Sequence, residues 1–309
     1  MKVVSLFSGA GGLDCGLIAA GNEVIWANDI DKDAVATYKE NLGNHIICSD
    51  IKDIKMEDIP FSDVVVGGFP CQGFSMANMQ RKVDDERNFL YKFFYKVIKE
   101  KQPKYFIAEN VRGILSLGNG AVIKKIISDF EKAGYFVEVN KVNMADYGVP
   151  QTRIRVIILG RRKDIKKELV LPPPTHDKNE KNGLKKWRSI KDALDRFPDP
   201  DEPNEVINHT YSKYKVTVRN FTGHRQTDPN KPSPTVLARG NGGGGVVAIP
   251  HYNGERRLTI RESAAVQTFP DNYHFIGAQN SCYRQVGNAV PCLFGKILGE
   301  ELKKIENGD

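Results

Sequence analysis

The sequence lacks the cysteine pattern of a metal-binding or disulfide-stabilised protein. Its five cysteines are an odd number, and no two of them form a C-x-x-C pair. Zinc sites and disulfide scaffolds both require paired or clustered thiols. We therefore expect reduced thiols, no metal site and a cytoplasmic protein.

Long apolar runs are also absent. No run is long enough to cross a bilayer, and Met1–Ser5 enters a predicted strand directly, without the apolar core of a signal peptide. No internal repeat is present. These absences argue against a membrane protein and against a repeat architecture.

The composition indicates a globular chain with a basic surface. Of 309 residues, 40% are hydrophobic, which is enough for one large domain, or for a large and a small one. Lys and Arg number 45 against 38 Asp and Glu, a net charge of +7. This excess favours a polyanionic partner, although a merely basic protein would have the same charge.

The first element is a strand at Val3–Phe7 that runs into the glycine-rich segment Phe7–Asp14 and then an apolar helix. A strand, a glycine-rich turn and a helix form the unit that holds a nucleotide-like cofactor. The spacing here is G-x-G-G and not the dinucleotide pattern G-x-G-x-x-G. A plain tight turn would use the same glycines.

Carboxylates follow the next two predicted strands. Asp29 and Asp31 follow Glu23–Asn28, and Asp50 follows His45–Cys48. An acid about 20 residues after the first glycine can accept hydrogen bonds from ribose. We favour Asp29 for this role, because Asp31 suits the N-cap of the following helix, whereas Asp50 suits either an adenine amino group or a turn.

Cys71 lies just after the apolar strand Asp63–Val66, in the segment Gly67–Ser75, which reads G-G-F-P-C-Q-G-F-S. Open α/β sheets bind ligands at the carboxyl ends of their strands, so this thiol is a candidate nucleophile. A buried structural thiol is the alternative. The polar segment Gln72–Arg87 that follows has the length of a lid or binding loop.

Charged residues recur around the following strands. Glu109 follows the predicted strand Tyr105–Ala108, and a hairpin is predicted from Tyr135–Val142 and Arg155–Gly160. If the segment before the second hairpin strand is extended, its period of two puts Gln151, Arg153 and Arg155 on one face, which could hold a carboxylate or phosphate. A solvated strand is the alternative.

The prolines at 172–174 mark a boundary, after which the chain is polar up to about residue 280. Basic and aromatic residues alternate over His209–Arg225, as on a nucleic-acid-binding face. The glycines at 240–245 make either a groove-approaching turn or a hairpin tip. A short helix capped by Thr259 and Glu262 follows, and a C-terminal helix is expected over Cys292–Ile305.

Six motifs in this order resemble the C5 cytosine-specific DNA methyltransferases of bacterial restriction-modification systems. They are F-S-G-A-G-G-L-D from Phe7, P-C-Q from Pro70, E-N-V from Glu109, Q-x-R-x-R from Gln151, Arg257 with Arg261-Glu262, and G-N-A-V-P from Gly287. The stretch near 175–255 has no matching motif and falls where that family keeps its target-recognition region.

The resemblance implies an α/β fold, the S-adenosylmethionine-dependent methyltransferase fold, with a mostly parallel sheet, helices on both faces and one antiparallel hairpin. It divides the chain into a catalytic domain of residues 1–171 and 281–309 and a target-recognition domain of residues 172–280. It implies double-stranded DNA as the partner, a monomer, and a separately encoded restriction endonuclease.

The resemblance also assigns roles. It implies Cys71, Glu109, Arg153 and Arg155 for catalysis. It implies S-adenosylmethionine as cofactor, without a metal, held by Phe7, Ser8, Gly9, Gly11, Gly12, Leu13, Asp29, Ile30, Asp50, Ile51, Pro70, Asn288 and Val290. For DNA we expect contacts from Ser75, Arg87, Arg219, Arg225 and Arg239.

Three other functions compete with this interpretation. A tRNA cytosine-5 methyltransferase would share the core motifs, but the sizeable variable region favours DNA. An NAD-dependent oxidoreductase would need G-x-G-x-x-G and would leave Cys71 and Glu109 without a role. A non-catalytic DNA-binding protein on the same scaffold would have no use for Cys71, Glu109 and Arg155 together.

Overall fold

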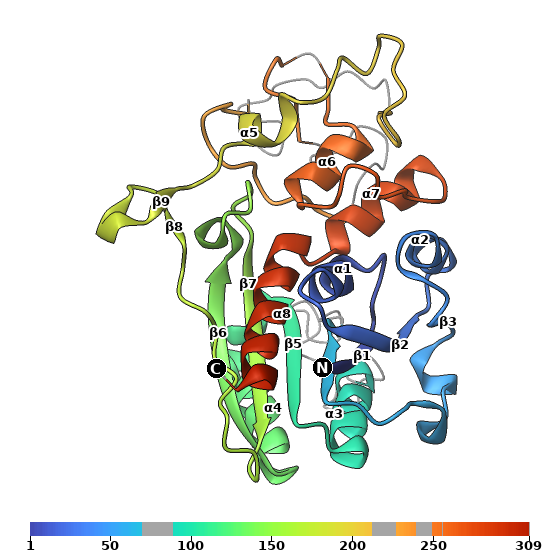
Figure 1. The fold of residues 1–309 in the computed structure, drawn as a ribbon, viewed down its shortest axis with the longest axis vertical. Coiled ribbons are helices and arrows are strands. Elements are labelled where there is room, and N and C mark those ends of the chain that lie inside the picture. The colour runs from blue at the N-terminus through green and yellow to red at the C-terminus, as the bar shows by residue number, and fades with distance from the viewer. Residues whose placement is uncertain (70–88, 212–226, 239–248, 255, 309) are drawn as a thin grey trace.

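A computed structural model of the chain describes residues 1–69, 89–211, 227–238, 249–254 and 256–308. Its centre is a seven-stranded sheet in the order β3-β2-β1-β4-β5-β7-β6, parallel except for the antiparallel β7 (Figure 1). This confirms the expected mostly parallel sheet with one antiparallel hairpin. The strands are β1 Lys2–Leu6, β2 Glu23–Asp29, β3 Ile46–Cys48, β4 Val64–Gly67, β5 Tyr105–Val111, β6 Tyr135–Asn143 and β7 Ile154–Arg162.

Helices cover both faces of the sheet, which explains why its central strands are apolar on both sides. On one face, side chains of β1, β4 and β5 pack with three helices: α1 Gly12–Ala19, α2 Lys32–Leu42 and α8 Cys292–Asn307. On the other face they pack with two: α3 Phe89–Lys101 and α4 Ala121–Lys132. Short 3-10 turns complete this part, at Ile51–Asp53, Met56–Asp58, Arg112–Leu115, Leu117–Gly120 and Met144–Tyr147.

The C-terminal helix returns to the N-terminal one through unusually close packing. A Cβ added at Gly16 of α1 would lie 2.2 Å from the main-chain oxygen of Cys292, and one at Gly295 of α8 would lie 2.6 Å from that of Leu13. No side chain fits between two backbones at this separation. Glycine at both positions therefore lets α8 complete the sheet's cover.

Glu109 lies inside a strand and not after its end, which corrects our expectation. The parallel pairing of β4 with β5 stops at Gly67 and Ala108, but the antiparallel pairing of β5 with β7 continues to Val111. The second partner strand prolongs β5 by three residues. Glu109 is thus held by a regular hydrogen-bonded ladder.

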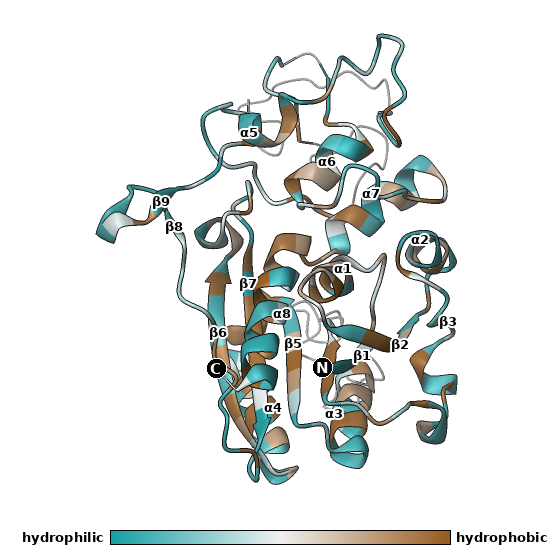
Figure 2. Ribbon diagram, in the orientation of Figure 1, coloured by the Kyte–Doolittle hydropathy of each residue, from teal (hydrophilic) through white to brown (hydrophobic). Residues whose placement is uncertain are grey.

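A second lobe lies above the carboxyl edge of the sheet (Figure 1). It contains α5 Ile190–Leu194, α6 Ile260–Val266 and α7 Gln279–Asn288, together with the short paired strands β8 His176–Asp177 and β9 Lys185–Lys186 and a 3-10 turn at Lys181–Gly183. Its residues are mostly hydrophilic (Figure 2). We did not expect α5 and α7, since both are short and polar at several positions.

The second lobe has its own apolar core. Buried side chains of α5, α6 and α7 gather around Phe269, Tyr273 and Phe275, and Ala10 of the first turn joins them. The expected capping box is confirmed, since the Thr259 hydroxyl accepts from Glu262 N and the Glu262 carboxylate accepts from Thr259 N. The boundaries at 172 and 281 stay a prediction, and α7 packs on both α2 and α6.

Within the described ranges, no helix has the length and apolar character needed to cross a membrane.

Candidate active site

Glu109 and Arg155 form an ion pair at the carboxyl edge of the sheet. Arg155 of β7 lies opposite Val111 of β5, and Glu109 lies two residues before Val111 on the same strand. The side chains of Glu109 and Arg155 are therefore diagonal neighbours on one face of the sheet. Arg155 Nε lies 2.8 Å from Oε1 of Glu109, and one Arg155 terminal nitrogen donates to its neighbour's carbonyl at Ile154. Both side chains are largely buried.

The chain leading to the candidate nucleophile begins beside this pair. A Cβ at Gly68 would lie 3.2 Å from Oε2 of Glu109, and the Asn110 amide donates to the Phe69 carbonyl at 3.0 Å. Asn110 is a functional candidate that the sequence pattern did not single out, although it stands in the E-N-V motif. Cys71, Pro70, Ser75 and Arg87 lie outside the described residues.

A cleft of about 550 Å³ opens next to Arg155. Its walls come from the end of β5, the β6–β7 hairpin and the second lobe, and they consist of Val111, Arg112, Gly113, Asn143, Thr152, Ile154, Arg155, Thr235 and Leu237. Val111 and Leu237 are exposed apolar side chains in this lining. The cleft thus combines charged and apolar side chains, as ligand sites usually do.

Arg153 has different partners from Arg155. Its guanidinium donates to the carbonyls of Val236, Gly287 and Ala289 at 2.9, 3.0 and 3.1 Å, and the side chain is 1% exposed. Burial, and then the nearby charge of Arg155, lower the pKa of Arg153 to about 9. Arg153 therefore joins the second lobe to the sheet domain.

Gln151 belongs to the same buried junction. Its amide donates to the Gln267 side chain at 2.7 Å and its oxygen accepts from Val236 N at 2.9 Å. Gln267 in turn donates to the carbonyls of Val286 and Ala289. The segment 151–155 thus does not offer one face with three free donors, because the first two donors are used within the protein.

The first turn adopts a conformation that favours glycine. Phe7, Gly9 and Gly11 have φ values of 56°, 56° and 79°. The positive φ of Phe7 is unfavourable for a side chain with a Cβ and was not evident from the sequence. The turn is held by the Gly9 N–H, which donates to Oδ2 of Asp29 at 2.7 Å.

Asp29 and Asp31 accept hydrogen bonds from different parts of the chain. Asp31 is the N-cap of α2, accepting from the N–H groups of Asp33 and Ala34, which confirms that part of the interpretation. Asp29 also accepts from Asp31 N at 2.9 Å, and burial raises its pKa against these hydrogen bonds.

The adjoining residues leave room for a cofactor. Ile30 is 63% exposed, and a Cβ at Gly9 would meet no atom within 4 Å. An open glycine turn, a carboxylate and an exposed apolar side chain fit the methionine, ribose and adenine parts of S-adenosylmethionine, respectively.

The remaining expected cofactor residues surround this turn in different ways. A Cβ at Gly12 would lie 2.4 Å from the Val290 carbonyl, so the first and last motifs are in contact, and Asn288 is exposed beside them. Asp50 caps a 3-10 turn by accepting from Lys52 N. The side chains of three expected residues are buried in the core: Leu13, Ile51 and Val290. The Ser8 hydroxyl donates hydrogen bonds to the main-chain carbonyls of Ser5 and Asn28.

Asp14 is a buried carboxyl that the sequence pattern did not mark as functional. It is 1% exposed and accepts from the Ser5 hydroxyl at 2.8 Å and from the Tyr38 hydroxyl at 2.9 Å. The Tyr38 hydroxyl also lies 3.0 Å from Nε2 of His45. Burial raises the pKa of Asp14 to about 6. In the sequence, the only indication of this buried carboxyl was an acidic residue within an otherwise apolar turn-helix segment.

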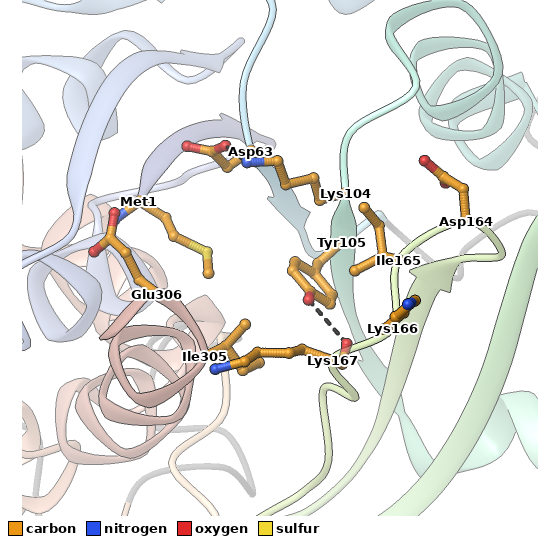
Figure 3. Close-up of a pocket in the computed structure, with 10 residues that line it drawn as sticks. All are labelled: Met1, Asp63, Lys104, Tyr105, Asp164, Ile165, Lys166, Lys167, Ile305 and Glu306. Carbon is orange, nitrogen blue, oxygen red and sulfur yellow. Dashed lines mark hydrogen bonds and ion pairs between the residues drawn. The ribbon is translucent and has the colours of Figure 1, made fainter. Parts of the chain in front are cut away.

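A second pocket, of about 360 Å³, lies at the opposite edge of the sheet (Figure 3). Asp63 precedes β4 and Tyr105 begins β5, and both line it. The Tyr105 hydroxyl donates to the Lys167 carbonyl at 2.9 Å. Because this is the amino edge of the parallel strands, the pocket is remote from Glu109 and the first turn.

The expected DNA-reading residues Arg219, Arg225 and Arg239 lie outside the described residues.

Comparison with known proteins identifies the family. Residues 1–304 match the family described as C-5 cytosine-specific DNA methylase. The chain belongs to this family.

Individual members of the C-5 cytosine-specific DNA methylases are similar over most of their length. Type II methyltransferase M.NgoFVII of Neisseria gonorrhoeae is 39% identical over 94% of this chain and 83% of its own. Type II methyltransferase M.FnuDI of Fusobacterium nucleatum is 37% identical over 98% and 94%. A prophage-encoded E. coli protein, described as a DNA modification methyltransferase, superposes with a TM-score of 0.78 at 25% identity and 99% coverage of both chains.

The chain is therefore a DNA cytosine-5 methyltransferase of the S-adenosylmethionine-dependent class, as the motifs implied. In the part of the chain that the structure describes, no cluster of three or more metal-ligating side chains occurs.

Proposed function

We propose that this methyltransferase modifies one short sequence in double-stranded DNA and serves as the modification enzyme of a restriction-modification system. The single observation that carries the proposal is the Glu109–Arg155 pair beside the start of the Cys71 segment. The similarity to type II methyltransferases supports it. A cognate endonuclease, a monomeric enzyme and a cytoplasmic location are part of the proposal.

Cys71 is the proposed nucleophile. Cytosine C5 is too weak a nucleophile to accept a methyl group unaided, and a thiolate that adds to C6 makes C5 carbanion-like. Once C5 has taken up the methyl group, loss of the C5 proton and expulsion of the thiolate restore the aromatic ring. The positive charge of Arg155 near the start of this segment favours thiolate over thiol.

Glu109 is the proposed acid that stabilises the adduct. A proton shared between its carboxyl group and ring N3 would compensate the charge that develops when the thiolate adds. Arg155 holds Glu109 in place by the 2.8 Å contact, and its remaining donors can bind the base carbonyl. We propose a positioning role for Arg153, since its donors bind main-chain carbonyls at the lobe junction.

The first turn is the proposed cofactor site. Gly9, Asp29 and Ile30 would hold the methionine, ribose and adenine groups, with Asp50 at the adenine amino group and Val290 closing the methionine end. S-adenosylmethionine supplies an electrophilic methyl group when it is bound. The chain's contribution is to orient it and to exclude water.

The base must leave the stacked duplex before this chemistry can take place. We propose that residues 72–87 close over the flipped base, with Ser75 and Arg87 at the DNA. Sequence recognition is assigned to residues 172–280, with Arg219, Arg225 and Arg239 as guanine-contacting candidates. The cleft that Val111, Arg155 and Leu237 help to line is the proposed entry for the base.

The deciding experiment is to incubate the protein with unmethylated plasmid and S-adenosylmethionine and to read every 5-methylcytosine by conversion sequencing. Methylation at one short recurring site is expected and would also give the target. Absence of methylation on DNA, with methylation of a tRNA cytosine instead, would overturn the proposed substrate. DNA binding without turnover that is unaffected by Cys71→Ala would indicate a non-catalytic protein.

A matched variant tests the nucleophile. Cys71→Ser is expected to abolish methyl transfer and to leave S-adenosylmethionine binding unchanged. Cys48→Ser, at an exposed thiol on β3, is the control and is expected to retain activity. Turnover by Cys71→Ser close to that of the wild type would refute the assignment.

A further inference from the structure

A basic arm, which we define as residues 175–188, projects from the molecule between the sheet domain and the second lobe (Figure 1). It carries five basic residues against two acidic ones, and Figure 2 shows it as mostly hydrophilic. Four of its lysines are exposed: Lys178, Lys181, Lys185 and Lys186. None of these four forms a salt bridge with another described residue.

The arm is braced against the sheet domain. Trp187 Nε1 donates to the Asp146 carboxylate at 2.9 Å, and Thr175 N donates to the Asp146 carbonyl at 3.0 Å. The His176 ring fills the space beside Gly148, where a Cβ would lie 2.8 Å from its Cε1. Both ends of the arm are thus attached to one short turn, Met144–Tyr147, and its direction is fixed.

The tip of the arm is a tight turn that is held by hydrogen bonds. Glu180, Asn182 and Gly183 have φ values of 56°, 55° and 74°, and the Asp177 carboxylate accepts from the N–H groups of Asn179 and Lys181. Left-handed conformations cost about 1 kcal/mol for residues with a Cβ. The carboxylate hydrogen bonds compensate this cost, so Asp177 shapes the turn and is not simply a counter-charge for the lysines.

Positive charges lie close together at the base of the arm. The pKa of His176 is lowered first by burial and then by the charges of Lys185 and Arg188. A cluster of exposed lysines, on a short projection that carries more basic than acidic residues, is suited to contact a polyanion with regularly spaced charges.

The arm is attached to a turn that directly follows a residue of the cleft. Asn143 lines the cleft, and the turn that holds the arm begins at the next residue, Met144. A duplex whose target base enters this cleft continues past it on both sides, with a charge every ~1.7 Å along its axis. The arm is therefore placed to meet the duplex on one flank of the site.

From these observations we infer that the basic arm binds the sugar-phosphate backbone of duplex DNA outside the recognition sequence. The inference rests on the proposed function, because it takes duplex DNA as the substrate. The arm contributes affinity that depends on duplex length and on salt, and it carries no sequence information.

The test replaces the four lysines together, as K178Q/K181Q/K185Q/K186Q, in the full-length protein. Binding is measured against two duplexes with the same site, one just covering the site and one with about 10 further base pairs on each side, over a range of salt. The matched control is K92Q/K99Q/K124Q/K132Q, which removes four exposed lysines of α3 and α4, far from the arm (Figure 1).

The variant is expected to lose about 5- to 50-fold in affinity for the long duplex and less than about 2-fold for the short one, with a salt slope reduced by about 0.9 for each phosphate that the arm no longer neutralises. Methylation of the short duplex at saturation stays unchanged. The charge-retaining K178R/K181R/K185R/K186R variant is expected to behave as the wild type, which separates loss of charge from misfolding.

Equal salt slopes for the arm variant and the α3–α4 control would overturn the inference, as would the same loss of affinity for both duplexes. Length-dependent binding that requires the arm, in a protein that methylates no duplex, would support the arm and refute the proposed function. Binding and methylation therefore test the two proposals separately.

Discussion

Arg155 Nε lies 2.8 Å from Oε1 of Glu109, and this contact joins two strands that run in opposite directions. On the other side of β5, the parallel strand β4 ends at this edge and leads into the Cys71 segment, whereas β7 begins at this edge with Ile154 and Arg155. The antiparallel β7 places a cation against the acid without any loop. The site's acid is thus oriented by the most regular part of the fold.

The first prediction concerns this pair. Glu109→Gln and Arg155→Lys are each expected to lower the rate of methyl transfer by about 10²- to 10⁴-fold. The first variant removes the proposed proton donor, and the second removes the arginine contact that holds this donor in place. Single-turnover kinetics on a duplex measure the rate, and calorimetric titration measures cofactor affinity, which is expected to be unchanged. A rate within about twofold of the wild type for Glu109→Gln would contradict the assignment.

The second prediction separates Arg153 from Arg155. Arg153→Ala removes a donor from three buried carbonyls, of which only that of Ala289 keeps a hydrogen bond from Gln267, so the free energy of unfolding is expected to fall by about 2–5 kcal/mol. Urea unfolding measures this change. Arg112→Ala, at an exposed arginine of the cleft, is the control and should stay within about 0.5 kcal/mol of the wild type. An Arg153→Ala protein of normal stability would mean that the lobe junction does not depend on this side chain.

The third prediction concerns the contact between α1 and α8. Gly16→Ala would place a methyl group 2.2 Å from the Cys292 oxygen and 2.3 Å from Lys296 N, both main-chain atoms that cannot move alone. We expect a loss of stability of about 1–3 kcal/mol or more, measured by thermal and urea unfolding. Gly113→Ala, where an added Cβ meets nothing within 4 Å, is the matched control. Equal stability of the two variants would disprove the close approach of α1 to α8.

The fourth prediction follows from the pKa of Asp14, which burial raises from 3.8 to about 6. Between these values the unfolded chain has lost a proton that the folded chain retains, so this group's contribution to stability falls as the pH rises and is constant above about 6. Compared with Asp14→Asn, the wild type is expected to lose about 1–2 kcal/mol of unfolding free energy between about pH 5 and pH 7.5.

The Asp14→Asn variant provides a clean comparison because an asparagine side chain can keep the network. Its amide oxygen can accept from Ser5 while its amide nitrogen donates to Tyr38, whose hydroxyl then donates to His45. Urea unfolding of both proteins at the two pH values measures the effect, and titrating groups outside this network cancel in the difference. A pH-independent difference would show that Asp14 titrates normally.

Much of this molecule could be predicted from local sequence. The apolar run Val64–Val66 is typical of a strand buried on both faces, and Thr259 with Glu262 is typical of a helix start, so these elements were found where expected. The G-x-G-G turn and the acid after the second strand predicted the Gly9–Asp29 region, because parallel strands end at a common edge.

Other features depend on partners that are distant in the sequence. The alternation of Gln151, Arg153 and Arg155 gave no sign that the first two would be used at the lobe junction, since their partners lie at 236, 267, 287 and 289. The extension of β5 through Glu109 required β7 as a second ladder.

The sequence by itself determined the family, the strand and helix periodicities and the chemistry available at the carboxyl edge, because each of these is set by residue type and short-range spacing. Only the tertiary structure decided which arginine contacts Glu109, how closely α1 approaches α8, and that residues 175–188 project as a braced arm. Those outcomes follow from long-range pairing, where buried hydrogen bonds must all be satisfied at once, and no local pattern specifies such partners.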